Sequence, residues 1–386
     1  MRGRIIKRKG SSNYTIVLQL GLDPVSGKRK QRWIAAGTSK REAEAKLAEL
    51  LHEQAQGTLT KPNKLTIGEC LDQWLRDYRP RIAPNTAQSY EFFIERHIKP
   101  AIGQIPLTSL TPVHLQRLYS DKLSSGRKDG KGGLSGRSVR YIHVTLHRAL
   151  KSAVRLGILS RNVADNVDVP GIECHEMRTM TEDDILTFLE SAKTGPYYVL
   201  YFLALFSGLR RSELLGLRWT DIDLLGCQLS VTRTLHRLNN GEIIFKEPKT
   251  QKSRRLVALS PATVQVLRDH KASQETERLL AGKLLKEDDL VFAQPDGQPL
   301  KPDTVSHAFV ALARRLGFEG ISLHSCRHSH ATLLLKRNTH PAVVMQRLGH
   351  SSITVTINTY SHVMPSLQKS AAKDFDSIIT PERESH

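Results

Sequence analysis

The order of apolar and polar positions predicts a small β-sheet followed by a helix at the start of the chain. Residues 14–20 are rich in β-branched and apolar side chains, the segment after them carries the proline and glycine of a turn, and a second strand is expected at residues 30–35. A capping pattern at residues 39–42 then precedes apolar positions at helical spacing, namely Ala43, Leu47, Leu50 and Leu51. Residues 1–57 hold few large apolar side chains, so we expect a thin core and strands that face a ligand.

Helical periodicity then continues almost without interruption over residues 65–160, after a polar, proline-containing linker at residues 57–64. The first helix starts with a capping pattern at residues 66–69, and two later helices start at prolines. The last helix, about residues 137–156, carries basic side chains beside an apolar stripe. A basic module of four or five helices is therefore expected.

A second change of pattern lies at residues 162–171, which hold a proline and a glycine and lack helical periodicity. Beyond it, a capped helix begins near Thr181, and residues 197–206 are apolar on every side, as in a buried helix. Segments rich in β-branched residues then predict short antiparallel strands near residues 228–232, 242–245 and 254–259.

The expected fold class is therefore a multidomain α+β protein. Residues 1–57 are assigned to a three-stranded sheet with one helix, residues 65–160 to an all-α domain, and residues 172–386 to a mainly α domain with a small antiparallel sheet. A chain of 386 residues is long enough to form several such cores.

The composition favours a polyanionic partner. Lys and Arg total 57 against 38 Asp and Glu, which gives a formal net charge of +19 and a sequence pI near 9.9. Most of this positive charge lies in the first 170 residues, so the first two modules are expected to bind the phosphate backbone of a nucleic acid. No apolar run approaches the roughly 18 residues of a spanning helix, and no signal-peptide pattern follows the charged N-terminus. A cytoplasmic location is expected.

Metal and disulfide chemistry are not predicted. The four cysteines stand far apart, with no paired spacing, at Cys70, Cys174, Cys227 and Cys326. His324, His328 and His330 lie close in the sequence, but no carboxylate accompanies them in an HExxH-like frame. We therefore expect neither a metal nor a cofactor.

The clearest candidate chemistry lies towards the C-terminus. His324 and Arg327 are three positions apart, so on a helix they share a face and can converge on one small anion. A guanidinium matches phosphate oxygens through two hydrogen bonds, and an imidazole can donate or move a proton near neutral pH. His350 and Tyr360 follow, and the tyrosine is a candidate nucleophile, although such a residue alone is more commonly a packing residue.

Two earlier segments can complete this site. Arg210 follows a glycine and leucine at the end of the buried helix, and Glu213, three residues further on, can orient its guanidinium. Lys249 lies on a turn between two predicted strands, from which a lysine can reach into a neighbouring site. Taken alone, Lys249 would be interpreted as a surface lysine.

Basic side chains in the first two modules are candidate DNA contacts, because a β-ribbon or a helix fits the major groove. They are Arg4, Lys28, Arg29, Lys30 and Arg32, with Trp33 beside them, and Arg137 and Arg140 in the last helix of the second module. The alternative is a basic surface that only meets solvent.

In chain order these residues resemble the tyrosine recombinases, the phage integrase family. Residues 208–213 (Gly-Leu-Arg-Arg-Ser-Glu) look like the family's first arginine box. Residues 248–250 (Pro-Lys-Thr) look like its β-hairpin lysine, and residues 324–327 (His-Ser-Cys-Arg) like its His-x-x-Arg motif. Residues 348–350 and 358–362 resemble its closing histidine and tyrosine boxes, and the resemblance covers nearly the whole chain.

The resemblance implies an arm-type DNA-binding domain at residues 1–57, a core-type DNA-binding domain at residues 65–160 and a catalytic domain at residues 172–386. It implies double-stranded DNA with core and arm attachment sites as a partner, and a homotetramer on that DNA. An excision factor or a host DNA-bending protein would join the assembly. The implied function is integration and excision of a prophage or conjugative transposon in the cytoplasm of a bacterial host.

The family's phosphate-binding and acid roles fit the chemistry of the matching residues. Attack on a phosphodiester builds negative charge on its oxygens, and without a metal Arg210 and Arg327 are the natural donors. His350 would be a further donor to the phosphate. Lys249 would act as the general acid that protonates the leaving 5′-oxygen.

The nucleophile implied by the resemblance is Tyr360. A tyrosine near its unperturbed pKa of about 10 is a weak nucleophile, so a base is needed, and His324 is the candidate. The resulting 3′-phosphotyrosyl bond would keep the energy of the broken linkage. Religation would then need neither ATP nor a cofactor.

Two other functions stay open at this point. A host chromosome-dimer resolvase of the same family would resemble only the two later domains, so the basic module at residues 1–57 favours an integrase. A catalytically silent DNA-binding regulator would have no need of the tyrosine, and the six matching active positions weigh against it.

Overall fold

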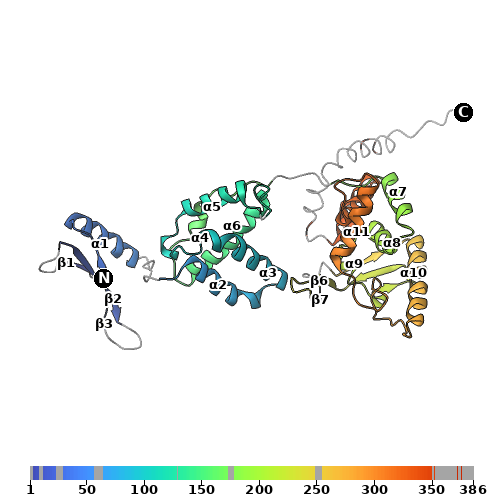
Figure 1. The fold of residues 1–386 in the computed structure, drawn as a ribbon, viewed down its shortest axis with the longest axis horizontal. Helices are drawn as coiled ribbons and strands as arrows, with labels where there is room; N and C mark the ends of the chain where they lie inside the picture. The colour runs from blue at the N-terminus through green and yellow to red at the C-terminus, as the bar shows by residue number, and fades with distance from the viewer. Residues whose placement is uncertain are drawn as a thin grey trace. The chain divides into compact units, whose positions relative to one another are not determined.

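The computed structural model describes residues 3–7, 12–22, 29–55, 64–127, 129–172, 178–247 and 254–349, and the single positions 352, 372 and 375. The chain divides into two compact units, Met1–Cys174 and His175–His386 (Figure 1). No helix within the described ranges is long and apolar enough to cross a membrane.

The first unit begins with a three-stranded antiparallel sheet and a helix. Strands β1 (Gly3–Lys7), β2 (Tyr14–Leu22) and β3 (Arg29–Ala35) lie in that order, and helix α1 (Lys40–Ala55) packs on the sheet. One row across the sheet, Ile5, Ile16 and Ile34, faces the apolar side of α1. The buried cluster between sheet and helix is small, as the sequence predicts, and has Ile16, Ala36 and Ala43 at its centre.

The remainder of the first unit is helical. In chain order its elements are α2 (Ile67–Tyr78), η1 (Arg79–Arg81), α3 (Pro84–Phe93), the π-helical turn η2 (Ile94–Ile98), α4 (Lys99–Ile102), η3 (Leu107–Ser109), α5 (Pro112–Ser125), α6 (Gly136–Arg155) and η4 (Val163–Asn166). Their apolar faces meet in one core around Trp74, Tyr119 and Leu146. Val163 and Ala164 are buried in the same core, so the segment that the sequence marks as a boundary begins within this fold.

The predicted capping pattern at the start of α2 is confirmed. The Glu69 amide donates to the Thr66 hydroxyl oxygen at 3.3 Å, and the Thr66 amide donates to the Glu69 carboxylate at 2.8 Å. Two amides that have no partner inside the helix are thereby satisfied, which fixes where the helix begins.

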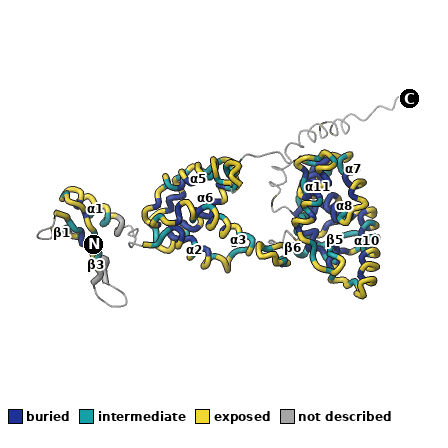
Figure 2. The backbone as a smooth tube through the Cα atoms, in the orientation of Figure 1, coloured by how far each residue is buried: buried dark blue, intermediate teal, exposed yellow. Residues whose placement is uncertain are grey.

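The second unit is built around one buried helix, as its all-round apolar sequence predicts. Helix α8 (Tyr198–Ser207) contacts α7 (Glu182–Ala192), α10 (Pro261–Leu280) and α12 (Leu323–Lys336). Figure 2 shows α8 as largely buried in the interior of this unit. The elements α9 (Arg211–Leu214), η5 (Trp219–Asp221), α11 (Pro302–Arg315) and α13 (Pro341–Leu348) complete its helical part.

The strands of the second unit form two small antiparallel sheets. One has the order β4 (Ile222–Asp223), β5 (Gln228–Val231) and β8 (Arg255–Ala258), and the other pairs β6 (Thr234–Arg237) with β7 (Ile243–Lys246). The strand predicted near residues 242–245 therefore pairs with β6 rather than with the other two predicted strands. The expected α+β fold class, with a small N-terminal sheet and a mainly helical remainder, is confirmed.

Candidate functional site

Helix α12 carries both members of the His-x-x-Arg pattern. His324 lies in its first turn, with part of the ring open to solvent, whereas Arg327 is only 2% exposed. Because positions three apart share a helix face, the imidazole and the guanidinium are neighbours. The prediction that a single helix brings these two groups together is confirmed.

The Arg327 side chain joins the ends of two other helices. Its guanidinium donates to the carbonyl oxygen of Gly208 at 2.8 Å and to that of Leu348 at 2.6 Å. Gly208 follows α8 with a φ of 67°, and a Cβ there would lie 2.8 Å from the His330 ring. Glycine is required at this position both for the left-handed backbone and for the close approach of α12.

Arg210 stands at the start of α9, where Glu213 holds it in two ways. The Arg210 amide donates to Glu213 Oε2 at 2.8 Å, and its Nη1 donates to Glu213 Oε1 at 2.9 Å. Glu213 is 3% exposed, while the Arg210 side chain is 37% exposed. The carboxylate therefore orients a guanidinium that solvent, or a ligand, can still reach.

Arg255 on β8 is a member of this cluster that the sequence did not single out. Its Nη1 and Nη2 donate to the two carboxylate oxygens of Glu213 at 3.1 and 2.9 Å, and the side chain is 6% exposed. The strand pattern carried a signal for it, since Arg255 shares the inward face with buried Val257 while Leu256 is exposed. Two arginines thus share one buried carboxylate.

Charge and burial set the protonation of the cluster. Burial alone would raise the pKa of Glu213, but hydrogen bonds and charge from Arg255 and Arg210 outweigh it and hold that pKa below its ordinary value. The pKa of His324 is lowered by its loss of solvent contact and by the nearby Arg327 and Arg210 guanidinium groups. At neutral pH His324 is therefore uncharged and can accept a proton.

Four residues of the predicted site, Lys28, Lys249, His350 and Tyr360, lie outside the described residues. Strands on either side bracket the segment with Lys249, since β7 ends at Lys246 and β8 begins at Arg255. Gly349, the last residue described without interruption, directly precedes His350 in the sequence. What the described part of the chain brings together is Arg210, His324 and Arg327.

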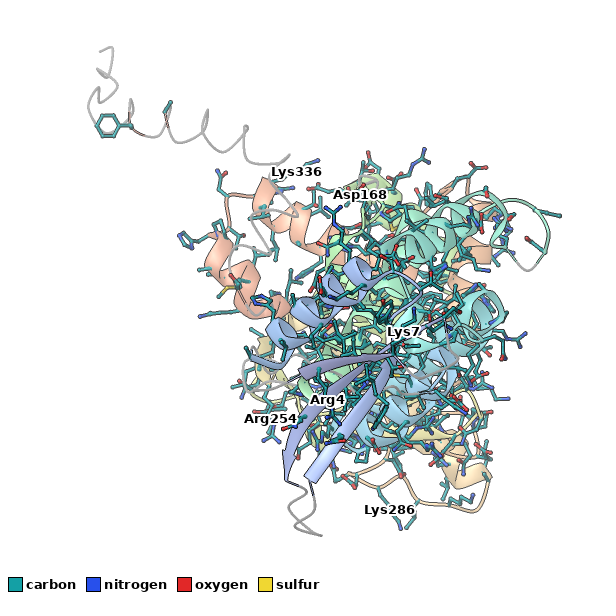
Figure 3. The ribbon with its side chains drawn as sticks, turned by 90° about the vertical axis from the view of Figure 1, so that its left-hand side faces the viewer. Arg4, Lys7, Asp168, Arg254, Lys286 and Lys336 are labelled. Atoms are coloured by element: carbon teal, nitrogen blue, oxygen red, sulfur yellow. The ribbon has the colours of Figure 1, made fainter. Side chains whose placement is uncertain are left out.

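The N-terminal sheet separates its basic residues onto two faces. Arg4 (Figure 3), Val17 and Trp33 stand opposite one another across β1, β2 and β3, on the face away from α1. Trp33 is 50% exposed. Arg32 pairs with Leu18 on the face that α1 covers. For Arg29 and Lys30 only the backbone in β3 is described. A ligand on the open face would meet Arg4 and Trp33 but not Arg32.

In the helical part of the first unit, Arg137 and Arg140 are exposed on α6. Beside them Tyr141 is 54% exposed and stacks on Phe93, with ring centroids 5.7 Å apart. Basic and aromatic groups on one surface can contact both phosphates and bases.

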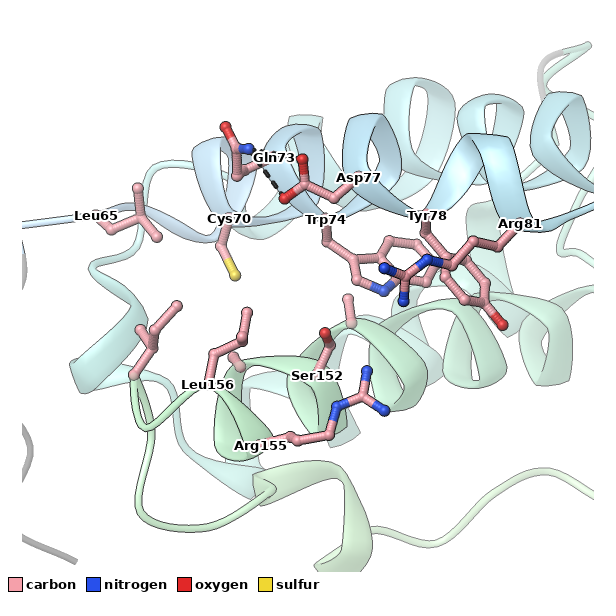
Figure 4. Close-up of a pocket in the computed structure, with 13 residues that line it drawn as sticks. Leu65, Cys70, Gln73, Trp74, Asp77, Tyr78, Arg81, Ser152, Arg155 and Leu156 are labelled. Atoms are coloured by element: carbon pink, nitrogen blue, oxygen red, sulfur yellow. Dashed lines mark hydrogen bonds between the residues drawn. The ribbon is translucent and has the colours of Figure 1, made fainter.

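A pocket of about 440 Å³ opens between α2 and α6 (Figure 4). Trp74 and Tyr78 line one side of it, and Ser152, Arg155 and Leu156 line the other. None of the candidate catalytic residues contributes to its lining, so this pocket is separate from the arginine cluster.

Comparison with known protein families matches two parts of the chain. Residues 178–366 match the phage integrase family, and residues 66–123 match the phage integrase N-terminal SAM-like domain. The chain is 28% identical to a protein named tyrosine recombinase XerC-like from Caldanaerobacter subterraneus subsp. tengcongensis, over 96% of this chain and 98% of that protein. It is 26% identical to the ICEBs1 integrase of Bacillus subtilis, over 97% of this chain and 100% of that protein.

Solved structures show the same fold. The Tn1549 transposon integrase in complex with transposon right end DNA has a TM-score of 0.68 at 21% identity, covering 80% of this chain and 99% of that chain. A lambda integrase dimer bound to a COC′ core site has a TM-score of 0.58 at 21% identity, and the match covers 92% of this chain and 94% of that chain. A lambda integrase tetramer bound to a Holliday junction has a TM-score of 0.57 at 22% identity, and the match covers 91% of this chain and 96% of that chain.

Proposed function

We propose that this chain, which belongs to the phage integrase family of tyrosine recombinases, cleaves and rejoins DNA through a 3′-phosphotyrosyl intermediate to integrate and excise a mobile element. The observation that carries the proposal is the cluster of Arg210, Arg327 and a neutral His324 in one site, in which buried Glu213 holds Arg210. Two guanidinium groups can stabilise the charge that develops on a phosphodiester under attack, and a neighbouring base can activate the nucleophile.

In the proposed cleavage, the Tyr360 oxygen attacks the scissile phosphorus and the bond from phosphorus to the 5′-oxygen breaks. His324 takes the tyrosine proton, which its depressed pKa allows because the ring is neutral at pH 7. Lys249 gives a proton to the leaving 5′-oxygen.

Charge that develops on the nonbridging oxygens is stabilised by Arg210 and Arg327, with His350 as a further donor. The reverse reaction, with the 5′-hydroxyl of another strand as the attacking group, completes strand exchange. One phosphodiester is thus exchanged for another through an ester of similar energy, so the proposed reaction uses no metal, ATP or cofactor.

We assign arm-type DNA binding to residues 1–57, core-type DNA binding to residues 65–160 and catalysis to residues 172–386. The open face with Arg4 and Trp33 and the α6 surface with Arg137 and Arg140 are the proposed contacts to double-stranded DNA. The reaction is proposed to run in the cytoplasm of a bacterial host.

Exchange of both strands between two duplexes requires four cleavages, so a homotetramer on DNA is the proposed working form. An excision factor or a host DNA-bending protein would set the direction of the reaction by shaping the DNA between arm and core sites. The DNA-bound Tn1549 integrase and the lambda integrase dimer and tetramer on DNA support double-stranded DNA and an oligomer as parts of this proposal.

A recombination assay tests this function. Two plasmids that carry the element's and the host's attachment sites are incubated with purified protein, and junction-specific amplification detects the products. The proposal expects recombinants with or without EDTA, whereas their loss in EDTA would point to a metal nuclease.

A nuclease footprint separates the integrase from the resolvase. Protection of distal arm sites as well as the core is the result expected for an integrase, and protection of one short core site alone would favour a chromosome-dimer resolvase. Binding without any strand exchange would favour a regulator.

A further inference from the structure

The C-terminal turn of α13 offers three consecutive backbone carbonyls to three arginines of the cluster. The contacts are Arg255 Nε to the carbonyl oxygen of Arg347 at 2.7 Å, Arg327 Nη2 to that of Leu348 at 2.6 Å, and Arg210 Nη2 to that of Gly349 at 3.4 Å. These arginines come from β8, α12 and the start of α9. The position of one short turn is therefore coupled to all three guanidinium groups.

The side chain of Arg347 anchors this turn to helices α8 and α12. Its Nε donates to His330 Nε2 at 3.0 Å, and its Nη2 donates to the carbonyl oxygen of Phe206 at 3.1 Å. The other ring nitrogen of His330, Nδ1, lies 2.8 Å from the carbonyl oxygen of Leu205. Because an arginine only donates, Nε2 must be the accepting nitrogen, so the ring is neutral and carries its proton on Nδ1.

Close packing around the C-terminal turn of α13 restricts movement of its backbone. Gly349 has a φ of 64°, and a Cβ on it would lie 2.9 Å from Arg255 Nη1. A Cβ on Gly208 would lie 2.8 Å from both His330 Cδ2 and Leu348 Cδ2. A shift of the turn therefore presses on the arginine cluster instead of being absorbed by empty space.

We infer that Arg347, held by His330, is a positioning residue that sets the orientation of Arg210 and Arg327. The inference rests on the proposed function for its catalytic consequence. Arg347 acts through the three carbonyls of its own turn, and its side chain binds the C-terminal end of α8, where the carbonyl oxygen of Gly208 accepts from Arg327.

Two substitutions remove the anchor in different ways. Arg347→Met keeps the length of the aliphatic stem and deletes every donor, and His330→Phe keeps the size of the ring and deletes both nitrogens. Gln346→Ala is the control, since Gln346 is the exposed neighbour on the same helix. Arg347→Lys restores one donor and should recover part of what Arg347→Met loses.

The first measurement is single-turnover formation of the covalent adduct on a nicked duplex that carries the attachment core. A displacement of reacting groups by about 1 Å can cost about 10²-fold in rate, so we expect a loss of that order in Arg347→Met and His330→Phe. Binding of the same duplex should stay near wild type, and Gln346→Ala should match wild type in both. Wild-type rates in both anchor variants would overturn the inference.

The second measurement needs no DNA. His324 is titrated by NMR in wild type, in Arg347→Met and in His330→Phe, because its pKa is lowered first by burial and then by the charges of nearby Arg327 and Arg210. If the turn positions these arginines, the pKa of His324 rises towards its ordinary value in both variants. An unchanged pKa would overturn the inference, as would unfolding of both variants at the assay temperature while Gln346→Ala stays folded. If wild type forms no adduct, the proposed function fails, and this titration still decides the positioning role.

Discussion

The exchange Glu213→Gln removes the charge that Arg210 and Arg255 share, with little change of shape. Glu213 is 3% exposed and accepts the Arg210 amide and three guanidinium hydrogen bonds at 2.9 to 3.1 Å. A glutamine can accept hydrogen bonds through its single oxygen only, and its NH2 group, itself a donor, would face a donor of Arg210 or Arg255. Arg255, itself 6% exposed, would then lose the charge of the carboxylate with which it pairs.

The expected cost follows from that burial. Removing one member of a buried ion pair costs about 3–5 kcal/mol, and we take about 3 kcal/mol because Arg210 is 37% exposed and can turn to solvent. For a unit of this size, about 1 kcal/mol lowers the melting temperature by roughly 2–4 °C, so a loss of roughly 6–12 °C is expected. The matched control is Glu247→Gln, whose partner Arg254 (Figure 3) lies in an exposed pair that contributes less than about 1 kcal/mol.

Urea unfolding of the second unit, followed at neutral and acidic pH, measures the difference. Because the folded-state pKa of Glu213 is lowered, its contribution is fully present above the ordinary glutamate value and is lost as the pH falls through the lowered one. The difference in free energy of unfolding between wild type and Glu213→Gln should therefore disappear at acidic pH. Equal losses in Glu213→Gln and Glu247→Gln at neutral pH would refute the shared-carboxylate reasoning.

Three further predictions address other parts of the chain. The pKa of His330 is lowered to about 4 by burial and by Arg347 and Arg327, so wild type should lose stability in melting experiments as the pH falls from about 6.5 towards 4, and His330→Phe should lose less. Lys249→Ala should slow cleavage by about 10²–10⁴-fold, and a substrate with sulfur in place of the bridging 5′-oxygen should restore the rate, because a thiolate leaves without a proton. Arg4→Ala should reduce the salt dependence of arm-site binding by about 0.9 in the log–log slope, while Lys40→Ala on α1 should leave it unchanged.

Contacts within a few residues of each other could be predicted from the sequence. The three-residue spacing of His324 and Arg327 implies a shared helix face, and the same spacing lets Glu213 reach Arg210, because helical geometry alone decides both. The role of Arg255 could not be predicted in this way. Its bonds to Glu213 join residues 42 apart and depend on how β8 packs against α9.

Register and buried polar groups account for other differences. The sequence treats Arg4 and Arg32 as one basic surface, but only the pairing of β1, β2 and β3 shows that they lie on opposite faces. Helix α10 gives little apolar periodicity, because its second half buries Gln274 and Arg278 instead of large apolar side chains. Hydrophobic pattern alone does not reveal such a helix.

The central claim is that Tyr360 forms the covalent bond to DNA, and mapping of the adduct tests it most directly. Purified protein is trapped on a nicked attachment-site duplex, digested with a protease, and the peptide that carries the 3′-phosphate is identified by mass spectrometry. We expect the adduct on Tyr360, with none in Tyr360→Phe although that variant still binds the duplex. An adduct on another residue, or cleavage by Tyr360→Phe, would contradict it.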